Sequence, residues 1–489
     1  MGTYLYKNEI KYARPYISGT RCNAYINGKK IWDDAEEGEF IIHTINTMNI
    51  IGGISIFTRG WGSTSQDVLY DWIIEGSLDG KDYELITTVT GSSSETGSIR
   101  VNIPFKFRSE NMYLRIKPNE EPYYGWARAF NMWNGDLREY RVLTADISSV
   151  QKGFRLDGTS NLGNNFLRGV WSTCNSLVSV ILPDTSDWDI TSIGDNFLRS
   201  TWSGCTSLTT AVVPDTSNWR VNTIGSDFLS WTWLSSSGSS LETAVVPDTS
   251  NWRVNSIGDM FLNCTWSSCD SLETAVVPDT SKWEVIGSLG DGFLSLTWQG
   301  CTSLKTAVVP DTSKWKITGI GNQFLSSTWI GTSLETAVVP DTSGWEVVGS
   351  VGNYFLSSTW KETVIKTAVV PDTSKWKITD IGEHFMRATW ENCTSLLSAV
   401  FPDTSGWNVG TIPHTGFLYT TLFMAFPLSG GGVLTIKDNV SNSVYSGRPA
   451  QGPGIDNNRI SSIRVPAALL SAFQNTQAWS QVKDKFVPI

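Results

Sequence analysis

One four-residue motif, Pro-Asp-Thr-Ser, recurs through the middle of this chain at an almost constant spacing. A tryptophan follows every copy after one intervening residue, and successive copies lie 30 to 33 residues apart. The eight copies begin at Pro183, Pro214, Pro247, Pro278, Pro310, Pro340, Pro371 and Pro402. Such a period is the signature of stacked repeats, each of which buries its apolar face only against its neighbours. It predicts a solenoid of about eight repeats.

Within one repeat, the residue types predict a short strand that ends at the proline. Leu208, Ala211 and Val213 follow an i, i+3, i+5 spacing, and β-branched valines favour strands. Pro214 lacks the amide hydrogen that a ladder needs, so we expect the strand to stop there. Asp215 and the two residues after it bond their own backbone in turns of this composition. Equivalent strands are expected about 4.8 Å apart in a parallel ladder.

The first 148 residues have a different pattern from the repeats. Asn27-Gly28 lies between two short β-like runs, which is a strong hairpin signal. Residues 54–61, 70–80, 83–91, 98–107 and 111–118 read as successive short strands with turn residues between them. This spacing predicts a β-sandwich.

We therefore expect a mainly β chain in four parts. These are an N-terminal attachment segment with the hairpin (1–35), a β-sandwich (36–148), the solenoid (149–428) and a C-terminal capping segment (429–489). The capping segment is expected to form a helix after Pro466, because solenoids need their open ends covered. The apolar residues expected to cover that end are Val465, Leu469, Leu470, Phe473 and Trp479.

Composition and charge argue against several partners. The net charge of −10 and the isoelectric point near 5.0 are unlike those of nucleic-acid-binding proteins, which carry basic patches. No run approaches the roughly 20 apolar residues of a spanning helix, and the N-terminus has no signal-peptide pattern. We therefore expect neither nucleic-acid binding nor membrane insertion.

The repeat unit resembles the BspA-type leucine-rich repeat. The stretch SGCTSLTTAVVPDTSNWRVNTIGSDFL (203–229) shows the Cys-x-Ser-Leu, the short strand ending in Pro, and the Ile-Gly before Phe that recur in that family. The resemblance covers about residues 155–425, and this repeat is about eight residues longer than the common family unit. The terminal stretch, residues 463–489, is also similar to the ends of such proteins. The resemblance implies non-catalytic adhesion, on bacterial surfaces and on phage particles.

The N-terminal region resembles a discoidin-type (F5/8 type C) galactose-binding-like domain over about residues 40–145. The resemblance depends on YDWIIEGSLDGKDYELITT (70–88), MYLRI (112–116) and LREYRV (137–142), and the usual flanking cysteine pair is absent. It implies a jelly-roll whose loops bind glycans or lipids. The start of the chain, YLYKNEIKYARPYISG (4–19), is similar in style to phage tail or fibre proteins.

Aromatic rows supply the candidate ligand-binding residues. The tryptophans after the turns could stack on sugar rings or on a partner protein; the alternative is that each ring packs between the rings above and below it. They are Trp188, Trp219, Trp252, Trp283, Trp315, Trp345, Trp376 and Trp407. A second row follows the Phe-Leu pairs and is expected in the core: Trp171, Trp202, Trp233, Trp266, Trp298, Trp329, Trp360 and Trp390.

A second candidate site lies in the N-terminal region. Trp61, Tyr123, Tyr124 and Trp126 are expected in loops at one end of the sandwich, where exposed aromatic rings would suit sugar binding. The alternative is that these rings pack against the first repeat or against a second copy of the chain.

Catalytic and metal-binding patterns are not found. The aspartates of the turns are expected to cap their own backbone rather than bind calcium. Five of the seven cysteines share one repeat slot, and we expect reduced, structural thiols. The three histidines lie far apart in sequence, and no common catalytic motif occurs. We therefore expect no enzyme activity, no metal and no cofactor.

The sequence thus favours a phage virion protein, a tail fibre or receptor-binding adhesin made in the host cytoplasm. Its expected partners are a host-surface glycan or protein, other virion proteins and further copies of itself. One alternative is a bacterial cell-surface adhesin of the same repeat family. Others are a purely structural virion decoration protein and, because threonine columns occur, an ice-binding protein.

Overall fold

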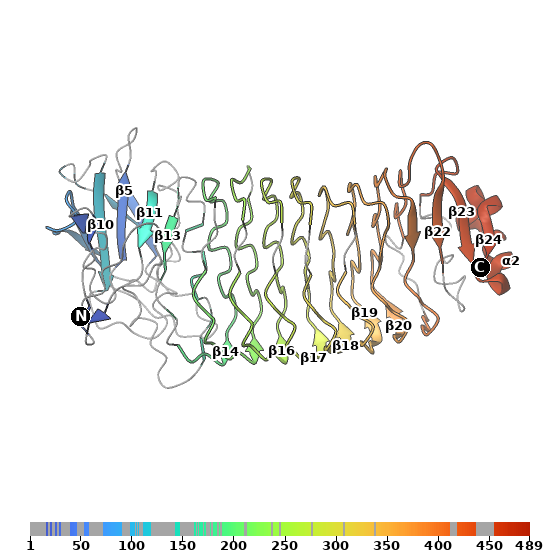
Figure 1. Ribbon diagram of the computed structural model, residues 1–489, viewed down its shortest axis with the longest axis horizontal. Helices are drawn as coiled ribbons and strands as arrows, with labels where there is room; N and C mark the ends of the chain where they lie inside the picture. The colour runs from blue at the N-terminus through green and yellow to red at the C-terminus, as the bar shows by residue number, and fades with distance from the viewer. Residues whose placement is uncertain are drawn as a thin grey trace.

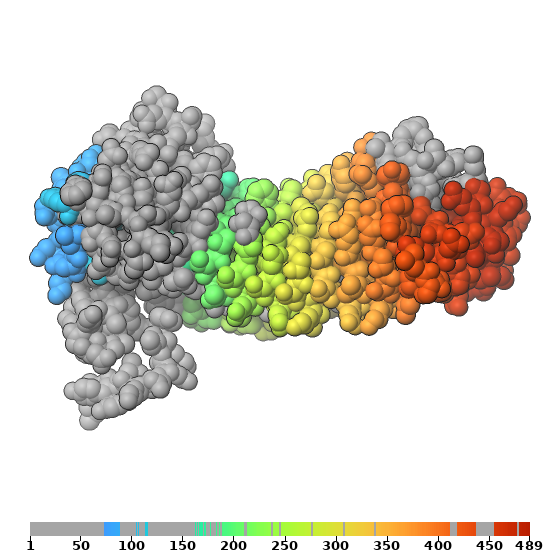
Figure 2. All heavy atoms as spheres, turned by 90° about the horizontal axis from the view of Figure 1, so that it is seen from above, coloured from blue at the N-terminus to red at the C-terminus, as the bar shows by residue number. Residues whose placement is uncertain are grey.

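A computed structural model describes residues 188–489, apart from 210–212, 236–237, 244–245, 275–276, 307–308, 337–338, 411–417 and 437–453. Before residue 188 it describes residues 72–89, the strands given below and some single residues. The architecture is mainly β, with a solenoid of about eight turns between residues 192 and 464. Figure 1 shows these turns side by side along the long axis of the molecule, and Figure 2 shows them stacked without a break from green to red.

The N-terminal region contains antiparallel sheets. Its strands are β1 (Tyr16–Ile17), β2 (Thr20–Arg21), β3 (Tyr25–Ile26), β4 (Lys29–Lys30), β5 (Phe40–Ile45), β6 (Gly53–Phe57), β7 (Trp72–Ser77), β8 (Glu84–Val89), β9 (Ser98–Asn102), β10 (Asn111–Pro118) and β11 (Val142–Asp146). Pairing of Ile26 with Lys29 confirms the predicted hairpin at Asn27-Gly28. Strands β6 to β10 confirm the five predicted strands, whereas their arrangement as a sandwich stays a prediction.

The repeats form parallel ladders. The strands are β12 (Asn161–Leu162), β13 (Ser179–Ile181), β14 (Ser192–Ile193), β15 (Thr223–Ile224), β16 (Ser256–Ile257), β17 (Ile286–Leu289), β18 (Lys316–Ile320), β19 (Val348–Val351) and β20 (Lys377–Ile381). One sheet contains β12 and β14–β16, and another contains β17–β20. Strand β13 instead joins a six-stranded sheet in the order β13-β11-β5-β10-β7-β8. The first repeat is therefore hydrogen-bonded to the N-terminal region.

We call each repeat a coil and number the coils along the chain. Coil 1 spans 166–196, coil 2 197–227, coil 3 228–260, coil 4 261–292, coil 5 293–323, coil 6 324–354, coil 7 355–384 and coil 8 385–416.

The main ladder lies after the turn, whereas we expected it before the turn. In coil 7, whose Thr-Ala-Val-Val-Pro segment is fully described, only Thr367 forms a parallel bridge, with Thr336 on one side and Ser398 on the other. The proline that follows carries no amide hydrogen, so the pairing does not extend toward it. The predicted slot does form strands in coil 1 and in coil 8, namely β13 and β21 (Ser398–Val400).

The Ile-Gly pair after each turn brings successive coils into close contact. A Cβ atom on Gly352 would lie 2.4 Å from the carbonyl oxygen of Gly321, and one on Gly382 would lie 2.4 Å from the amide nitrogen of Asn353. Only glycine permits such an approach of two backbones. The next residue of each coil then bonds across the gap: Asn353 Oδ1 accepts a hydrogen bond from the backbone N–H of Glu383, at 2.7 Å.

The turn motif both closes itself and links coils. Asp311 Oδ1 accepts a hydrogen bond from the backbone N–H of Ser313 (3.0 Å), which confirms the predicted capping role. Thr312 Oγ1 donates to the carbonyl oxygen of Asp341 in the next coil, at 2.6 Å. The threonine of the motif therefore faces inward and is not part of an exposed threonine surface.

A chain of tight turns forms the segment from Phe-Leu to Thr-Trp. In coil 2, Leu198 and Ser200 have φ values of 54° and 56°, at the third positions of two overlapping four-residue turns. A left-handed conformation costs about 1–2 kcal/mol for a residue with a side chain. Contacts between coils offset this cost: Leu198 N–H donates to Phe166 O (2.9 Å), and the buried Thr201 Oγ1 donates to Leu167 O (2.7 Å).

Coils 4 to 7 form two similar pairs. In coils 4 and 6, a glutamate precedes the bridging threonine and another glutamate follows the tryptophan of the turn. In coils 5 and 7, lysines occupy both positions. The ladder strands alternate in the same way, with four residues in β17 and β19 and five in β18 and β20. A register shift recurs inside each pair, at Gly287/Ser288 and at Gly349/Ser350. Two coils are therefore the larger repeating unit here.

The parallel stack continues into the segment predicted as a cap. Strand β21 pairs with β22 (Gly432–Thr435), which pairs with β23 (Ile460–Val465) and then β24 (Phe486–Pro488). The predicted helix is divided into η5 (Ala467–Leu469), α2 (Leu470–Gln474) and η6 (Gln477–Lys485). Val465, Phe473 and Trp479 are buried and Leu469 and Leu470 pack against the core, as predicted. No helix in the described parts of the chain is long and apolar enough to cross a membrane.

Candidate functional site

The tryptophan row after the turns is part of the core. Trp188 is half-buried, and Trp219, Trp252, Trp283, Trp315, Trp345, Trp376 and Trp407 are at most 2 % exposed. Neighbouring rings lie nearly parallel, as for Trp283 and Trp315, whose centroids are 6.4 Å apart with an interplanar angle of 4°. The seven buried rings present no open face to a sugar. The alternative that each ring packs between its neighbours is what the structure shows.

The second tryptophan row is also buried, as predicted. Trp266 and Trp298 illustrate the stacking, with centroids 5.9 Å apart. The phenylalanines form a third stacked column, and Phe293 meets Trp315 edge to face at 6.0 Å. The solenoid interior therefore contains three columns of stacked aromatic rings. Trp61, Tyr123, Tyr124 and Trp126 lie outside the described residues, so their role stays a prediction.

One tryptophan departs from both rows. Trp231 occupies a position of coil 3 where the other coils carry smaller residues, such as Ser200 in coil 2 and Cys264 in coil 4. Its side chain is 43 % exposed, the largest fraction among the tryptophans whose side chains are described. Trp231 was not among the predicted binding residues, because those were chosen from aromatic residues that recur in the repeats or lie in the N-terminal region. The sequence signal for Trp231 is a large aromatic residue at a position where other coils carry small residues.

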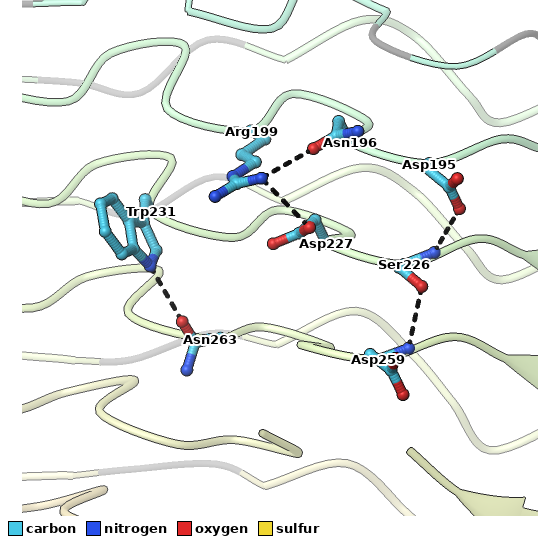
Figure 3. A network of polar contacts seen from close by, with 8 residues as sticks. All are labelled: Asp195, Asn196, Arg199, Ser226, Asp227, Trp231, Asp259 and Asn263. Atoms are coloured by element: carbon cyan, nitrogen blue, oxygen red, sulfur yellow. Dashed lines mark hydrogen bonds and ion pairs between the residues drawn. The ribbon is translucent and has the colours of Figure 1, made fainter. Parts of the chain in front are cut away.

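Polar side chains surround Trp231 (Figure 3). The guanidinium carbon of Arg199 lies 5.8 Å from the centroid of the Trp231 ring, within cation–π range. Arg199 Nη1 also donates to Asn196 Oδ1 at 3.0 Å and lies 3.2 Å from Asp227 Oδ2. On the other side, Trp231 Nε1 donates to Asn263 Oδ1 at 2.9 Å. These contacts hold the indole ring and the guanidinium group in fixed positions at the surface.

Arg168 adds a second guanidinium group in coil 1. It occupies the position that Arg199 occupies in coil 2, and Gly169 N–H donates to Arg199 O (2.8 Å) where the two coils meet. Partial burial lowers the pKa of Arg168, the charge of Arg199 lowers it further, and Asp227 opposes both effects. Arg168 and Arg199 therefore occupy equivalent positions of successive coils, whereas Trp231 occupies the next position along the repeat, that of Gly169 and Ser200.

Coil 3 also differs in length at this place. It has 33 residues, two more than coil 2, and the extra residues fall between Trp233 and Leu241, just after Trp231. Gly238, with a φ of 85°, and the bond from Ser235 Oγ to Gly238 O (2.6 Å) shape the longer loop. Two departures from the repeat thus occur side by side, as expected where a regular scaffold carries a site.

The described cysteines are free thiols. Cys205, Cys264, Cys269, Cys301 and Cys393 are buried, and the prediction of reduced, structural thiols is confirmed for these five. Burial raises the pKa of the Cys269 thiol to about 12 and that of Cys393 to about 11. Cys301 Sγ donates to the carbonyl oxygen of Trp266, at 3.0 Å. Within the described residues, no group of three or more His, Cys, Asp or Glu side chains is arranged to hold a metal ion.

Known protein families do not identify the chain. No family model matches the sequence, and no curated protein matches it. The solenoid and its repeat are therefore shown by the structure, while the two family resemblances carry only proposals.

Proposed function

We propose that this protein is a non-catalytic phage virion adhesin, a tail fibre or receptor-binding protein, that recognises a host-surface glycan through Trp231 and its neighbours. The observation that carries the glycan part is the 43 % exposure of Trp231 beside Arg199, in a solenoid whose repeating tryptophans are core. An indole face offers an apolar platform for the C–H face of a sugar ring. Arg199 lies beside this ring, and Asn196 and Asp227, which contact Arg199, are further hydrogen-bonding groups.

The rest of the chain suits this role. The solenoid is a rod whose coils are joined by stacked rings and by hydrogen bonds from one coil to the next, so it holds the site rigidly. The free thiols agree with assembly in a reducing host cytoplasm before release of the particle. The resemblance to BspA-type repeats and to fibre starts supports a virion surface location. The N-terminal region would attach to other virion proteins or bind sugar, and we propose a homo-oligomer.

Two alternatives remain as proposals. A bacterial surface adhesin of the same repeat family would use the same site. A structural decoration protein would need only the rod, which the alternating charges and aromatic columns already stabilise.

The test is binding of the full chain to intact bacteria and to a glycan array. Saturable binding that is lost in Trp231→Ala supports the proposal. Tyr419→Ala is the matched control, since Tyr419 is also 43 % exposed and lies 5.8 Å from the guanidinium carbon of Arg387. No binding to any cell or glycan would favour the structural alternative, and equal loss in both variants would overturn the assignment to Trp231.

A further inference from the structure

Two columns of alternating charge run along coils 4 to 7 of the solenoid. In the column before the turn the charges pair within the chain, as Lys305 does with Glu273 at 2.9 Å. In the column after the tryptophan, no side chain forms an ion pair or a hydrogen bond with any part of the chain that the structure describes. The residues of this second column, all exposed, are Glu284, Lys316, Glu346 and Lys377.

The ladder register explains why the second column stays unpaired. Lys316 lies beside Ile286, and Lys377 lies beside Val348, so each lysine is out of register with the glutamate of the preceding coil. Ile286 and Val348 are themselves 62 % and 60 % exposed. The outer side of this ladder therefore presents unpaired charges and exposed apolar side chains together, a combination that a partner could neutralise and cover.

We call the outward side of β17–β20 the ladder face. In β18 the outward residues are Lys316 and Thr318, while Ile317 between them is buried. Figure 1 shows the four strands side by side along one edge of the solenoid. Lysines just before the tryptophans border this face and bond to the preceding coil, as Lys282 Nζ does with Ser250 O at 2.8 Å. The alternating charges of the second column are therefore the ones available to a partner.

We propose that the ladder face binds the ladder face of a second copy of the chain, in a two-fold dimer that reverses the order of the coils. From coil 4 to coil 7 the charges are negative, positive, negative and positive, and the reversed order is opposite at every position. Glu284 then faces the partner's Lys377, and Lys316 faces the partner's Glu346. The two-fold axis repeats each contact, so every charge of the column is paired. The inference rests on the proposed homo-oligomer, whose surface it names, and not on glycan binding.

The same reversal covers the apolar side chains of the ladder face. Ile286 meets the partner's Thr379, and Val348 meets the partner's Thr318, so each apolar side chain packs against a threonine methyl group. Burial of this apolar surface adds to the charge contacts. The strands of the face have only four or five residues. Because small interfaces belong to transient complexes, we expect a reversible dimer.

The experiment is sedimentation equilibrium of the full chain over a range of protein concentrations, at about 20 mM and at about 500 mM salt. We expect a monomer–dimer equilibrium that is weaker at high salt. Glu284→Lys sets a like charge against the partner's Lys377 and should weaken the dimer at least about tenfold. Glu242→Lys is the matched control, because it reverses an exposed glutamate that precedes the turn, and should leave the dimer unchanged.

Mixtures of variants test which coils meet. Glu284→Lys and Lys377→Glu chains have opposite charges at every position of the reversed dimer, so together they should form a mixed dimer as tightly as the unchanged protein. Glu284→Lys and Lys316→Glu chains still set like charges against each other, so their mixture should stay weak. Two faces that run in the same direction and are shifted by one coil would give the opposite result for the two mixtures.

The outcomes separate this inference from the glycan-binding proposal. A monomer at every concentration, or rescue by Lys316→Glu instead of Lys377→Glu, would overturn the reversed dimer. Equal weakening by Glu242→Lys would also overturn it, since the effect would then be one of general charge. Glycan binding by the same samples is measured separately, and its loss would leave the dimer in place. Thermal melting of each variant checks that the fold is retained.

Discussion

Lys305 Nζ lies 2.9 Å from Glu273 Oε1, so an ion pair joins equivalent positions of two successive coils. The same contact recurs two coils later between Lys366 and Glu335, at 2.8 Å. Each acidic coil of the segment from coil 4 to coil 7 therefore lies next to a basic one. Because the coils are otherwise nearly identical, this alternation opposes the stacking of a coil on its second neighbour, where like charges would meet.

Deletion of one coil should reveal this charge alternation. Removing residues 293–323 would place coil 4 against coil 6 and set Glu273 opposite Glu335 and Glu284 opposite Glu346. We expect a lower melting temperature at about 20 mM salt, with a smaller deficit at about 1 M, because exposed charges are screened. Adding Glu273→Lys to the deletion should recover part of the loss at low salt, because the new lysine would lie between Glu242 of coil 3 and Glu335 of coil 6. If the two deletion proteins melt alike at low salt, the charges do not specify the stacking.

Gly352 should not tolerate a side chain. Gly352→Ala places a Cβ 2.4 Å from the backbone of the previous coil, so the coils must separate locally. We expect a loss of about 1–3 kcal/mol in unfolding free energy, as for other overpacked sites. Gly344→Ala is the matched control, because its nearest atom would be 3.6 Å away and other coils carry lysine there. Denaturant unfolding of both variants gives the comparison, and equal stability would contradict the close approach.

Alanine substitution should lower stability at Trp345 and ligand binding at Trp231. Trp345 is fully buried between stacked rings, so Trp345→Ala leaves a large cavity and should cost about 3–5 kcal/mol. Trp231→Ala should change the stability by much less, because the ring is 43 % exposed, and should act on ligand binding. Chemical denaturation measures the first effect and glycan binding the second. A stable Trp345→Ala protein would show that the ring columns do not hold the coils together.

The thiols should make stability fall at alkaline pH. Burial raises the pKa of Cys264 and Cys269 from 9.0 to about 12 and that of Cys393 to about 11. These groups keep their protons in the folded chain at pH values where the unfolded chain loses them. Their contribution to stability is therefore intact below pH 9 and is lost as the pH rises from 9 toward 11 and 12. Melting between pH 8 and 11 should show the fall, and Cys269→Ser should reduce it.

The same thiols should resist modification. At pH 8 a thiol reagent should leave Cys205, Cys264, Cys269, Cys301 and Cys393 unreacted in the native protein and modify them after unfolding, because only the thiolate reacts and these side chains are buried. Mass spectrometry after labelling identifies each residue. Rapid labelling of Cys301 in the folded protein would contradict the burial of its thiol.

The sequence predicted the solenoid because its period is unambiguous, and it predicted the roles of Asp311 and the Asn27-Gly28 hairpin because turn chemistry is local. It did not predict where the ladder runs, since that depends on how closely Gly352 and Gly321 approach. The left-handed conformation of Leu198 was not predictable from propensity, because hydrogen bonds between coils impose it. Trp231 was missed because only recurring residues were taken as candidates, although a large aromatic residue at a position that is small in other coils was a usable signal.

The most direct measurement of the central claim is fluorine NMR of the full chain labelled with 5-fluorotryptophan, titrated with a glycan that it binds. Trp231→Phe assigns the Trp231 signal, and a Trp188→Phe variant assigns the half-buried end of the turn row. The account predicts that the Trp231 signal shifts with saturation while the signals of the buried columns stay in place. A saturable shift of other tryptophan signals with the Trp231 signal unchanged would contradict it and move recognition elsewhere on the chain.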